Sequence, residues 1–560
     1  MKNMKKLLAL LLALIMVIGL VACGEPATPE TPDAPDQTQG QDTPDATEEA
    51  TDAPVAEGPK YGGHLDAHVY SKTSNVDPLK STGIWRYVWT TCVYENALTR
   101  DNENNIRPAV CEFELTEDQL ELKLWVREGV TFSNGDAVDI YDVEASINRA
   151  LNLYSSIVKK VTPNVESVVV DDADKSLTIK FHTYSEDNMY YLAAVQTWAA
   201  IMPKEICEKS PEDFIGENVE DAIGTGPYDI ENMETDVSIT LRKRDNYVPF
   251  ENDYTGLAAT KYGYMDTITF WHNGDNSSAT LALLSGDYDM TDVVDTSYLE
   301  MAAEQGIVLD KLPSDVGTAI IFNTAGANNI CAKYPDLRKA VMAAIDYEEF
   351  LNVVTDGAYV MGTDMILDPQ YESHQFMEVD YYGPANPEVA AKYLEAAYAA
   401  GYNGEPVQIQ QEAAKGDIMT MLKGYMDAAG IPCEVTGMEE GALSEFRSNV
   451  DNNWDFFFTW PTYKFTPTTL MTTDMNKYWT NERKDQLIEE MKPLVSGTDE
   501  YVAKWNELIE IMVDDCASVH MGTIYWYIYH PSDLIVEGRD NLAHYDYYNI
   551  HWENPEEHTS

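Results

Sequence analysis

Ser156 and Lys159 stand at the Ser-x-x-Lys spacing with which one class of serine enzymes activates its nucleophile. That chemistry also requires Ser-Asp-Asn and Lys-Thr-Gly partner motifs, and the sequence contains neither. A Gly-x-Ser-x-Gly elbow and a His-Glu-x-x-His zinc helix are absent as well. Because there is no Gly-Lys dipeptide, a phosphate-binding P-loop is missing too. The residues therefore predict a protein that is not an enzyme and has no ATP site of its own.

Two histidines, His64 and His68, are the best candidates for metal ligation. Their spacing puts them on one face of an expected strand, but about 13 Å apart along it, too far to chelate one ion closely. Other histidines, such as His520 and His530, show no ligand spacing. We predict no metal site and no cofactor.

The cysteines also indicate no specific chemistry. After Cys23 the chain has Cys92, Cys111, Cys207, Cys331, Cys433 and Cys516, with no Cys-x-x-Cys pair that would suggest zinc or thioredoxin-type redox chemistry. The wide spacings permit either disulfides or buried free thiols, and both remain open.

The N-terminus carries a targeting pattern. Lys2, Lys5 and Lys6 precede an apolar run that ends at Ala22, and the run is too short and wrongly flanked for a spanning helix. Leu20-Val21-Ala22-Cys23 resembles the lipobox of bacterial lipoproteins. We therefore expect residues 1–22 to be a lipoprotein signal peptide and Cys23 to be the lipid attachment site, which would place the protein outside the cytoplasm, anchored to the outer face of the cytoplasmic membrane.

Composition separates a tether from a folded part. Residues 23–60 are rich in Pro, Thr, Asp and Glu, and this composition predicts a disordered acidic tether. The rest, roughly 500 residues, is too long for a single core, so two or more lobes are expected. The formal net charge of −58 argues against a nucleic-acid partner, because phosphate binding requires a basic surface.

Helix and strand signals alternate in an α/β manner. Residues 120–127 alternate apolar with polar side chains, as a half-buried strand does, and Asp139 with Asp142 predicts the start of a helix. Residues 168–181 predict a hairpin around the turn 171–175. Asn386-Pro387 predicts the start of another helix, which Gly401 ends.

These elements carry motifs that resemble family 5 of the bacterial extracellular solute-binding proteins, which serves oligopeptide, dipeptide and nickel ABC importers. The matching segments are Gly62-Gly63-x-Leu65, Val76-Asp77-Pro78-Leu79, residues 93–98, residues 124–135, Asp142-Val143, residues 224–228, residues 283–289, Phe322-Asn323-Thr324, residues 337–340, Ile345-Asp346, residues 391–397 and Gly401-Tyr402. Most of these residues have structural roles to play; Gly135 and Gly226, for example, are expected to serve turns that need permissive backbone angles.

The resemblance implies an α/β fold of the type II periplasmic-binding-protein kind, with two hinged lobes and an extra domain inserted in the first. The expected domains are lobe I (61–95, 208–310 and 521–552), the inserted domain (96–207) and lobe II (311–520). Ligand-driven closure of the lobes would present the closed form to an ABC permease with a separate ATPase. The alternative is a surface receptor or adhesin of the same fold without transport.

By the same resemblance, aromatic and polar residues from several segments line the ligand cleft: Trp85, Tyr87, Thr197, Trp198, Trp460 and Tyr463. For each aromatic residue, packing in a core is an equally strong expectation. Peptide-binding members carry an Asp shortly after the residue that matches Trp460, where it pairs with the peptide ammonium. Here residues 461–467 contain no acid, and Tyr463 and Lys464 occupy that region. We therefore expect a peptide held differently, a modified amino acid, a sugar-like ligand or a metal chelate.

Overall fold

The computed structural model describes residues 60–559 except for positions 70–74, 81–86, 104, 195–196, 211–215, 217, 273–274, 293, 356, 363–378, 461–476 and 537–545. The chain divides into two units, Met1–Glu57 and Gly58–Ser560. The signal peptide, Cys23 and nearly all of the tether lie outside the described residues, so those expectations stay predictions. Everything below concerns the second unit.

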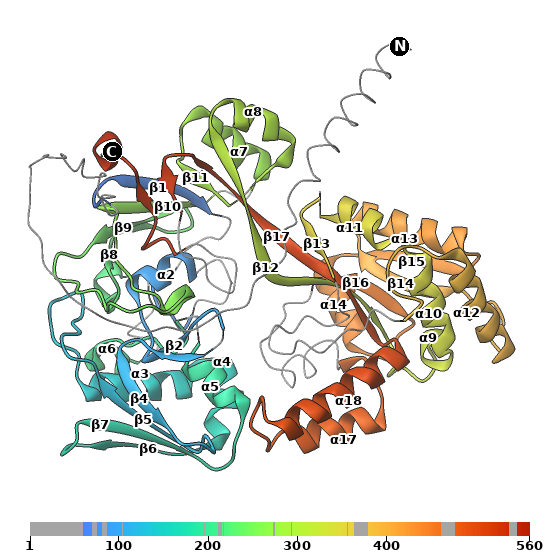
Figure 1. Cartoon of the computed structure of the whole chain (residues 1–560), viewed down its shortest axis with the longest axis horizontal. Coiled ribbons are helices and arrows are strands. Elements are labelled where there is room, and N and C mark those ends of the chain that lie inside the picture. Colours follow the sequence, from blue (N-terminus) through green and yellow to red (C-terminus); the bar gives the residue numbers. More distant parts are fainter. Residues whose placement is uncertain are drawn as a thin grey trace, which may run out of the picture. The chain divides into compact units, whose positions relative to one another are not determined.

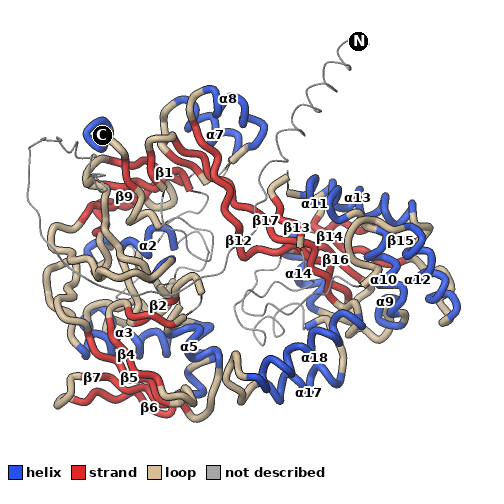
Figure 2. The backbone as a smooth tube through the Cα atoms, viewed as in Figure 1, coloured by secondary structure: helices blue, strands red, loops and turns tan. Residues whose placement is uncertain are grey.

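A large mixed sheet of 11 strands runs through this unit (Figures 1 and 2). Its two longest members, β12 (Ile307–Phe322) and β17 (Ser518–Pro531), pair antiparallel at its centre. On one side of this pair follow β11 (Met290–Thr291), β1 (His64–Val69), β10 (Thr267–His272), β9 (Ser238–Lys243) and β8 (Tyr228–Glu234). On the other side follow β16 (Phe456–Thr459), β14 (Val407–Glu412) and β15 (Cys433–Met438), while β13 (Tyr359–Met361) pairs with β17.

Smaller sheets complete the strand set. A four-stranded sheet has the order β4 (Cys111–Leu115), β5 (Glu121–Val126), β7 (Ser176–Phe181) and β6 (Val165–Asp171). Two-stranded sheets join β2 (Leu98–Arg100) to β3 (Ile106–Pro108), and β18 (Leu534–Ile535) to β19 (His551–Trp552).

Helices accompany each group of strands. Near the N-terminal strands and the four-stranded sheet are α2 (Tyr87–Val93), α3 (Ile140–Leu153), α4 (Ser155–Lys160), α5 (Glu186–Leu192) and α6 (Lys204–Cys207). Helices α7 (Asn276–Ser285) and α8 (Leu299–Glu304) precede β12. After β12 come α9 (Ile330–Lys333), α10 (Pro335–Ala344), α11 (Tyr347–Val354), α12 (Pro387–Ala399), α13 (Gly416–Ala428), α14 (Glu440–Ser448), α17 (Glu482–Met491) and α18 (Asp499–Asp515).

The elements predicted from local patterns are confirmed. Helix α3 begins at a capping box in which Asp139 and Asp142 each accept from the other's backbone N–H. Asn386 caps α12, and Gly401, with φ +105°, follows its end. The predicted hairpin is β6–β7, joined through the turn at 172–175. The predicted strand at 120–127 is β5, whose Leu122 and Leu124 are buried.

Buried apolar side chains gather into separate cores. One contains residues of β1, β8, β9, β10 and α2, a second belongs to α3 and the four-stranded sheet, and a third lies around β14, β16 and the helices after β12. Below, the terms lobe I, inserted domain and lobe II refer to the parts of the chain around these three cores; the domain division itself stays a prediction. The exact domain boundaries stay predictions.

One backbone expectation is wrong. Gly135 does adopt a left-handed conformation, with φ +93°. Gly226 does not. A Cβ at Gly226 would lie 2.4 Å from the Cys92 carbonyl oxygen, so glycine is required there by the close approach of α2.

Candidate ligand-binding site

The strands β12 and β17 connect the lobes and contain an irregularity between them. Pro313 pairs with Tyr525, whereas Gly317 pairs with Thr523. An advance of four residues along β12 therefore matches an advance of only two residues along β17. Before this register shift, Leu309 of β12 packs in a small cluster with Tyr529 of β17. After it, Ala319 of β12 belongs to the lobe II core. A bulge interrupts the ladder and increases local twist. A second register shift follows between Thr318 and Ala319, so the ladder that connects the cores is irregular at two neighbouring places.

The same stretch of β17 carries three consecutive aromatic residues, Tyr525, Trp526 and Tyr527, each only half-buried. Trp526 packs against the lobe I core, and the Lys311 ammonium lies 5.5 Å from the Tyr527 ring centroid. Large rings left partly accessible between two cores suit a ligand wall. The sequence analysis missed them, although three adjacent aromatics in a strand cannot all face one core.

Thr197 and Trp198 belong to the segment that follows α5 in the inserted domain. The Thr197 hydroxyl donates to the Thr90 hydroxyl of α2 over 3.2 Å, which links this segment to the helix that begins at Tyr87. Trp198 is 8 % exposed and stacks on Tyr154, with ring centroids 5.6 Å apart. Its packing is that of a core side chain that holds the segment in place.

Asn96 fixes the same segment from the side. Its amide nitrogen donates to the Ala194 carbonyl over 2.9 Å, and its carbonyl oxygen accepts from the Ala199 N–H over 3.2 Å. Asn96 belongs to the family motif at residues 93–98. The motif marked this residue in the sequence, but it did not show that the Asn96 side chain holds residues 194–199 in place.

Trp460 lies in lobe II, directly after the last residue of β16 that pairs with β12. It is half-buried, and its ring meets that of Phe458 edge to face at 4.9 Å. Trp85 and Tyr463 lie outside the described residues, and so does the side chain of Tyr87. Three of the six predicted site residues are thus not described with their side chains, and the set stays a prediction.

A buried ion pair joins Asp77 of lobe I to α3 of the inserted domain. The Arg149 guanidinium of α3 donates to both carboxylate oxygens of Asp77, over 3.1 and 2.7 Å. The two side chains are 4 % and 1 % exposed. Asp77 also accepts from the Leu79 N–H, so one carboxylate shapes its own turn and holds α3 against it.

A small polar cavity lies next to Thr197. It has a volume of about 30 Å³ and is lined by Glu95 and Lys261, whose charged groups are 3.5 Å apart. This space accommodates a water molecule but not a solute.

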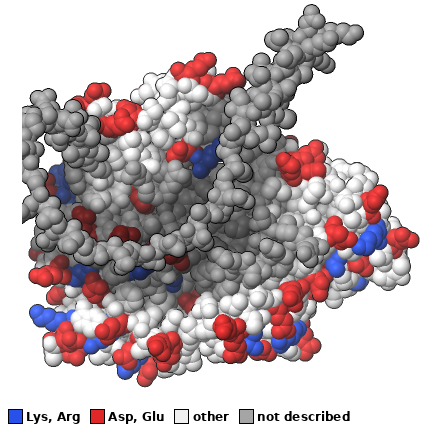
Figure 3. Space-filling view, viewed as in Figure 1, with Lys and Arg blue, Asp and Glu red and all other residues white. Residues whose placement is uncertain are grey.

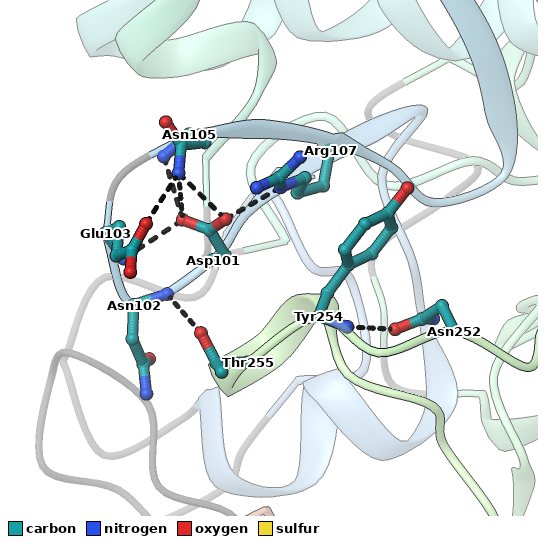
Figure 4. Close-up of polar contacts among 8 residues, drawn as sticks. All are labelled: Asp101, Asn102, Glu103, Asn105, Arg107, Asn252, Tyr254 and Thr255. Carbon is teal, nitrogen blue, oxygen red and sulfur yellow. Dashed lines mark hydrogen bonds and ion pairs between the residues drawn. The ribbon is translucent and has the colours of Figure 1, made fainter. Parts of the chain in front are cut away.

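Asn252, one of the residues that line the cavity, also belongs to the polar cluster shown in Figure 4. Asp101 accepts from the side chains of Asn105 and Arg107, and the Asn102 N–H donates to the Thr255 hydroxyl. Burial acts to raise the pKa of Asp101, but these hydrogen bonds outweigh it, and the pKa lies below its usual range. The cluster fastens the inserted domain to lobe I.

The histidines predicted to share a strand do so in β1. His64 lies 2.5 Å from the Thr267 hydroxyl and 3.2 Å from the Asp66 carboxylate, whereas His68 lies 3.0 Å from the Thr291 hydroxyl. Over the described part of the chain, no cluster of three or more His, Cys, Asp or Glu side chains could hold a metal ion. The six cysteines after Cys23 are free thiols, and all except Cys433 are buried.

Comparison with known proteins decides the family. A model described as bacterial extracellular solute-binding proteins, family 5 Middle, matches residues 105–482. The chain belongs to this family. It is 22% identical over 521 residues to the oligopeptide-binding protein AppA of Bacillus subtilis, covering 88% of this chain and 90% of AppA. It is also 22% identical over 405 residues to the glutathione-binding protein GsiB of Salmonella paratyphi A, covering 70% and 73% of the two chains.

The fold has solved counterparts. The crystal structure of the ABC transporter substrate-binding protein CtaP from Listeria monocytogenes superposes with a TM-score of 0.73 at 15% identity, covering 88% of this chain and all of CtaP. The predicted type II periplasmic-binding-protein fold is thereby confirmed.

Members of the family are solute-binding proteins of ABC importers for peptides or similar solutes, not enzymes, and act outside the cytoplasm. Among the described helices, none has the length and apolarity to cross a bilayer.

Proposed function

We propose that this protein is a lipid-anchored receptor that captures a small solute, peptide-like or otherwise, between its lobes and delivers it to a membrane permease. The observation that carries the proposal is the pair β12–β17, which connects two separate cores and is irregular between Pro313 and Gly317. A connection of this kind permits closure, and a ligand that contacts both lobes favours the closed state.

The signal-like N-terminus supports the anchor. Cys23 follows an apolar segment that begins after three lysines, and a long acidic, proline-rich stretch separates it from the folded part. A diacylglyceryl group on Cys23 would supply two acyl chains, enough for stable anchoring, and the polar tether would keep the binding unit near the permease. Figure 3 shows many Asp and Glu side chains spread over the visible face, consistent with the net charge of −58 and with a surface that repels anionic headgroups.

For the ligand, we propose that Trp85, Tyr87, Thr197, Trp460 and Tyr463 form the binding surface, with Trp198 packed behind Thr197. Tyr525, Trp526 and Tyr527 of the connecting strand extend it. The names of the relatives speak for oligopeptides and glutathione as first candidates. The acid-free stretch after Trp460 speaks against the usual ammonium anchor, because a buried ammonium without a counter-charge is costly.

The test is a thermal-shift screen of the chain lacking residues 1–23 against peptides of two to nine residues, glutathione, sugars, amines and a nickel–histidine chelate. One class is expected to raise the melting temperature by mass action. Trp460→Ala should abolish that shift without lowering the melting temperature of the free protein by more than a few degrees, since the ring is half-buried. No stabilisation by any class, or an unchanged shift in Trp460→Ala, would contradict the proposal for the function or for the site respectively.

A further inference from the structure

The inserted domain and lobe II make a direct polar contact far from the connecting strands. The backbone N–H of Ser496 donates a hydrogen bond to the hydroxyl oxygen of Tyr184 over 3.1 Å. Tyr184 lies just before α5, and Ser496 lies in the loop between α17 and α18, which approaches α5 in Figure 1. The two residues are separated by 312 positions in the sequence, so only the arrangement of the domains brings them together.

The surfaces around this hydrogen bond do not pack tightly. A cavity of about 350 Å³ separates them, lined by Asn164, Tyr184 and Ser185 of the inserted domain and by Ile488, Met491 and Lys492 of lobe II. The hydrogen bond therefore lies beside an open space rather than within a closely packed interface.

The charges near the contact are paired within their own domains. Lys160 lies 3.4 Å from Asp187 in the inserted domain, and Lys492 pairs with Glu489 at the end of α17. Each of these lysines thus has a carboxylate partner within its own domain. The hydrogen bond from the Ser496 amide to the Tyr184 hydroxyl is a directional contact across this edge, and it does not depend on pairing between ammonium and carboxylate groups.

We propose that the Tyr184 hydroxyl and the Ser496 amide form a latch that holds the inserted domain against lobe II and sets the open–closed equilibrium before any solute binds. This inference rests on the domain closure in the proposed function but not on the identity of the solute. A net intramolecular hydrogen bond of ordinary strength changes such an equilibrium roughly two- to tenfold. Because only the closed state retains the solute, solute affinity would fall by a similar factor when the latch is lost.

Tyr184→Phe removes the acceptor and leaves the ring. Tyr262→Phe is the matched control, because the Tyr262 hydroxyl donates to Glu251 within lobe I over 3.1 Å. Ser496→Pro, which removes the donor, is the second latch variant. The variants are made in the chain lacking residues 1–23, with Cys433→Ser and with spin labels on Glu117→Cys and Glu500→Cys, two exposed positions in the inserted domain and lobe II.

Two measurements without solute test the latch. Tyr184→Phe should accelerate amide exchange of residues 494–498 roughly two- to tenfold, the factor expected for one hydrogen bond, and both latch variants should shift the label-to-label distances toward longer values. Tyr262→Phe should do neither. Unchanged exchange and unchanged distances in Tyr184→Phe would overturn the proposal. If the latch variants open the protein but no solute in the screen binds, the latch stands and the proposed function fails. If a solute binds and Tyr184→Phe behaves like Tyr262→Phe, only the latch fails.

Discussion

Replacing Arg149 with methionine tests how the inserted domain is held to lobe I. The substitution leaves the Asp77 carboxylate 1 % exposed and without its guanidinium partner. Removing one member of a buried ion pair costs about 3–5 kcal/mol, because the remaining charge cannot be solvated. The cost should appear where Asp77 and Arg149 lie, in residues 75–80 and in α3.

Native-state hydrogen exchange of α3 peptides measures this loss locally, which suits a chain with several cores better than a single melting temperature. A loss of about 3–5 kcal/mol corresponds to roughly 100- to several-thousand-fold faster exchange through opening. The control is the pair Asp77→Asn with Arg149→Met, which removes both charges while the amide oxygen introduced at position 77 can still accept from the Leu79 N–H. We expect this double variant to recover roughly 1–3 kcal/mol relative to Arg149→Met alone.

Two outcomes would refute the reasoning. Exchange in α3 that changes less than about threefold in Arg149→Met would show that the ion pair carries no net stability, as surface pairs often do not. A double variant less stable than Arg149→Met would show that the cost comes from lost packing of the arginine stem rather than from an uncompensated carboxylate.

Two further predictions concern buried groups. Burial raises the pKa of Asp546 to about 7 from the ordinary 3.8, despite the opposing effects of Tyr548 and Lys261. The folded chain then holds a proton that the unfolded chain releases, so this group makes stability fall as pH rises from about 4 to about 7. Asp546→Asn should flatten that pH dependence and stabilise the protein at pH 8 by roughly 4 kcal/mol at most. Urea unfolding of both proteins at about pH 5 and pH 8 measures the effect. The same pH dependence of the free energy of unfolding in both proteins would contradict the prediction. Gly226→Ala should cost about 1–3 kcal/mol, because its methyl group meets the Cys92 carbonyl. It should destabilise the protein more than Gly424→Ala, a position in α13 with no positive φ and no atom within 4 Å of the added Cβ. Equal urea midpoints for the two variants would exclude the close approach as the cause.

Local patterns in the sequence were enough for the regular elements and for the family. The capping box at Asp139, the Asn386-Pro387 start of α12 and the hairpin around 171–175 involve neighbours a few positions apart, and such interactions act in almost any tertiary context. The ordered motifs from Gly62 to Tyr402 were enough to indicate the fold that the comparison with solved structures then confirmed.

The tertiary structure alone decided which side chains meet. Asp77 and Arg149 are 72 positions apart and Tyr184 and Ser496 are 312 apart, and no periodicity relates either pair. It also decided that Trp198 packs in a core and that Gly226 is needed for close approach rather than for a turn. The physical reason is range: hydrogen-bond caps and hydrophobic alternation are encoded by adjacent residues, whereas burial and pairing depend on how distant segments pack, which a local pattern does not contain.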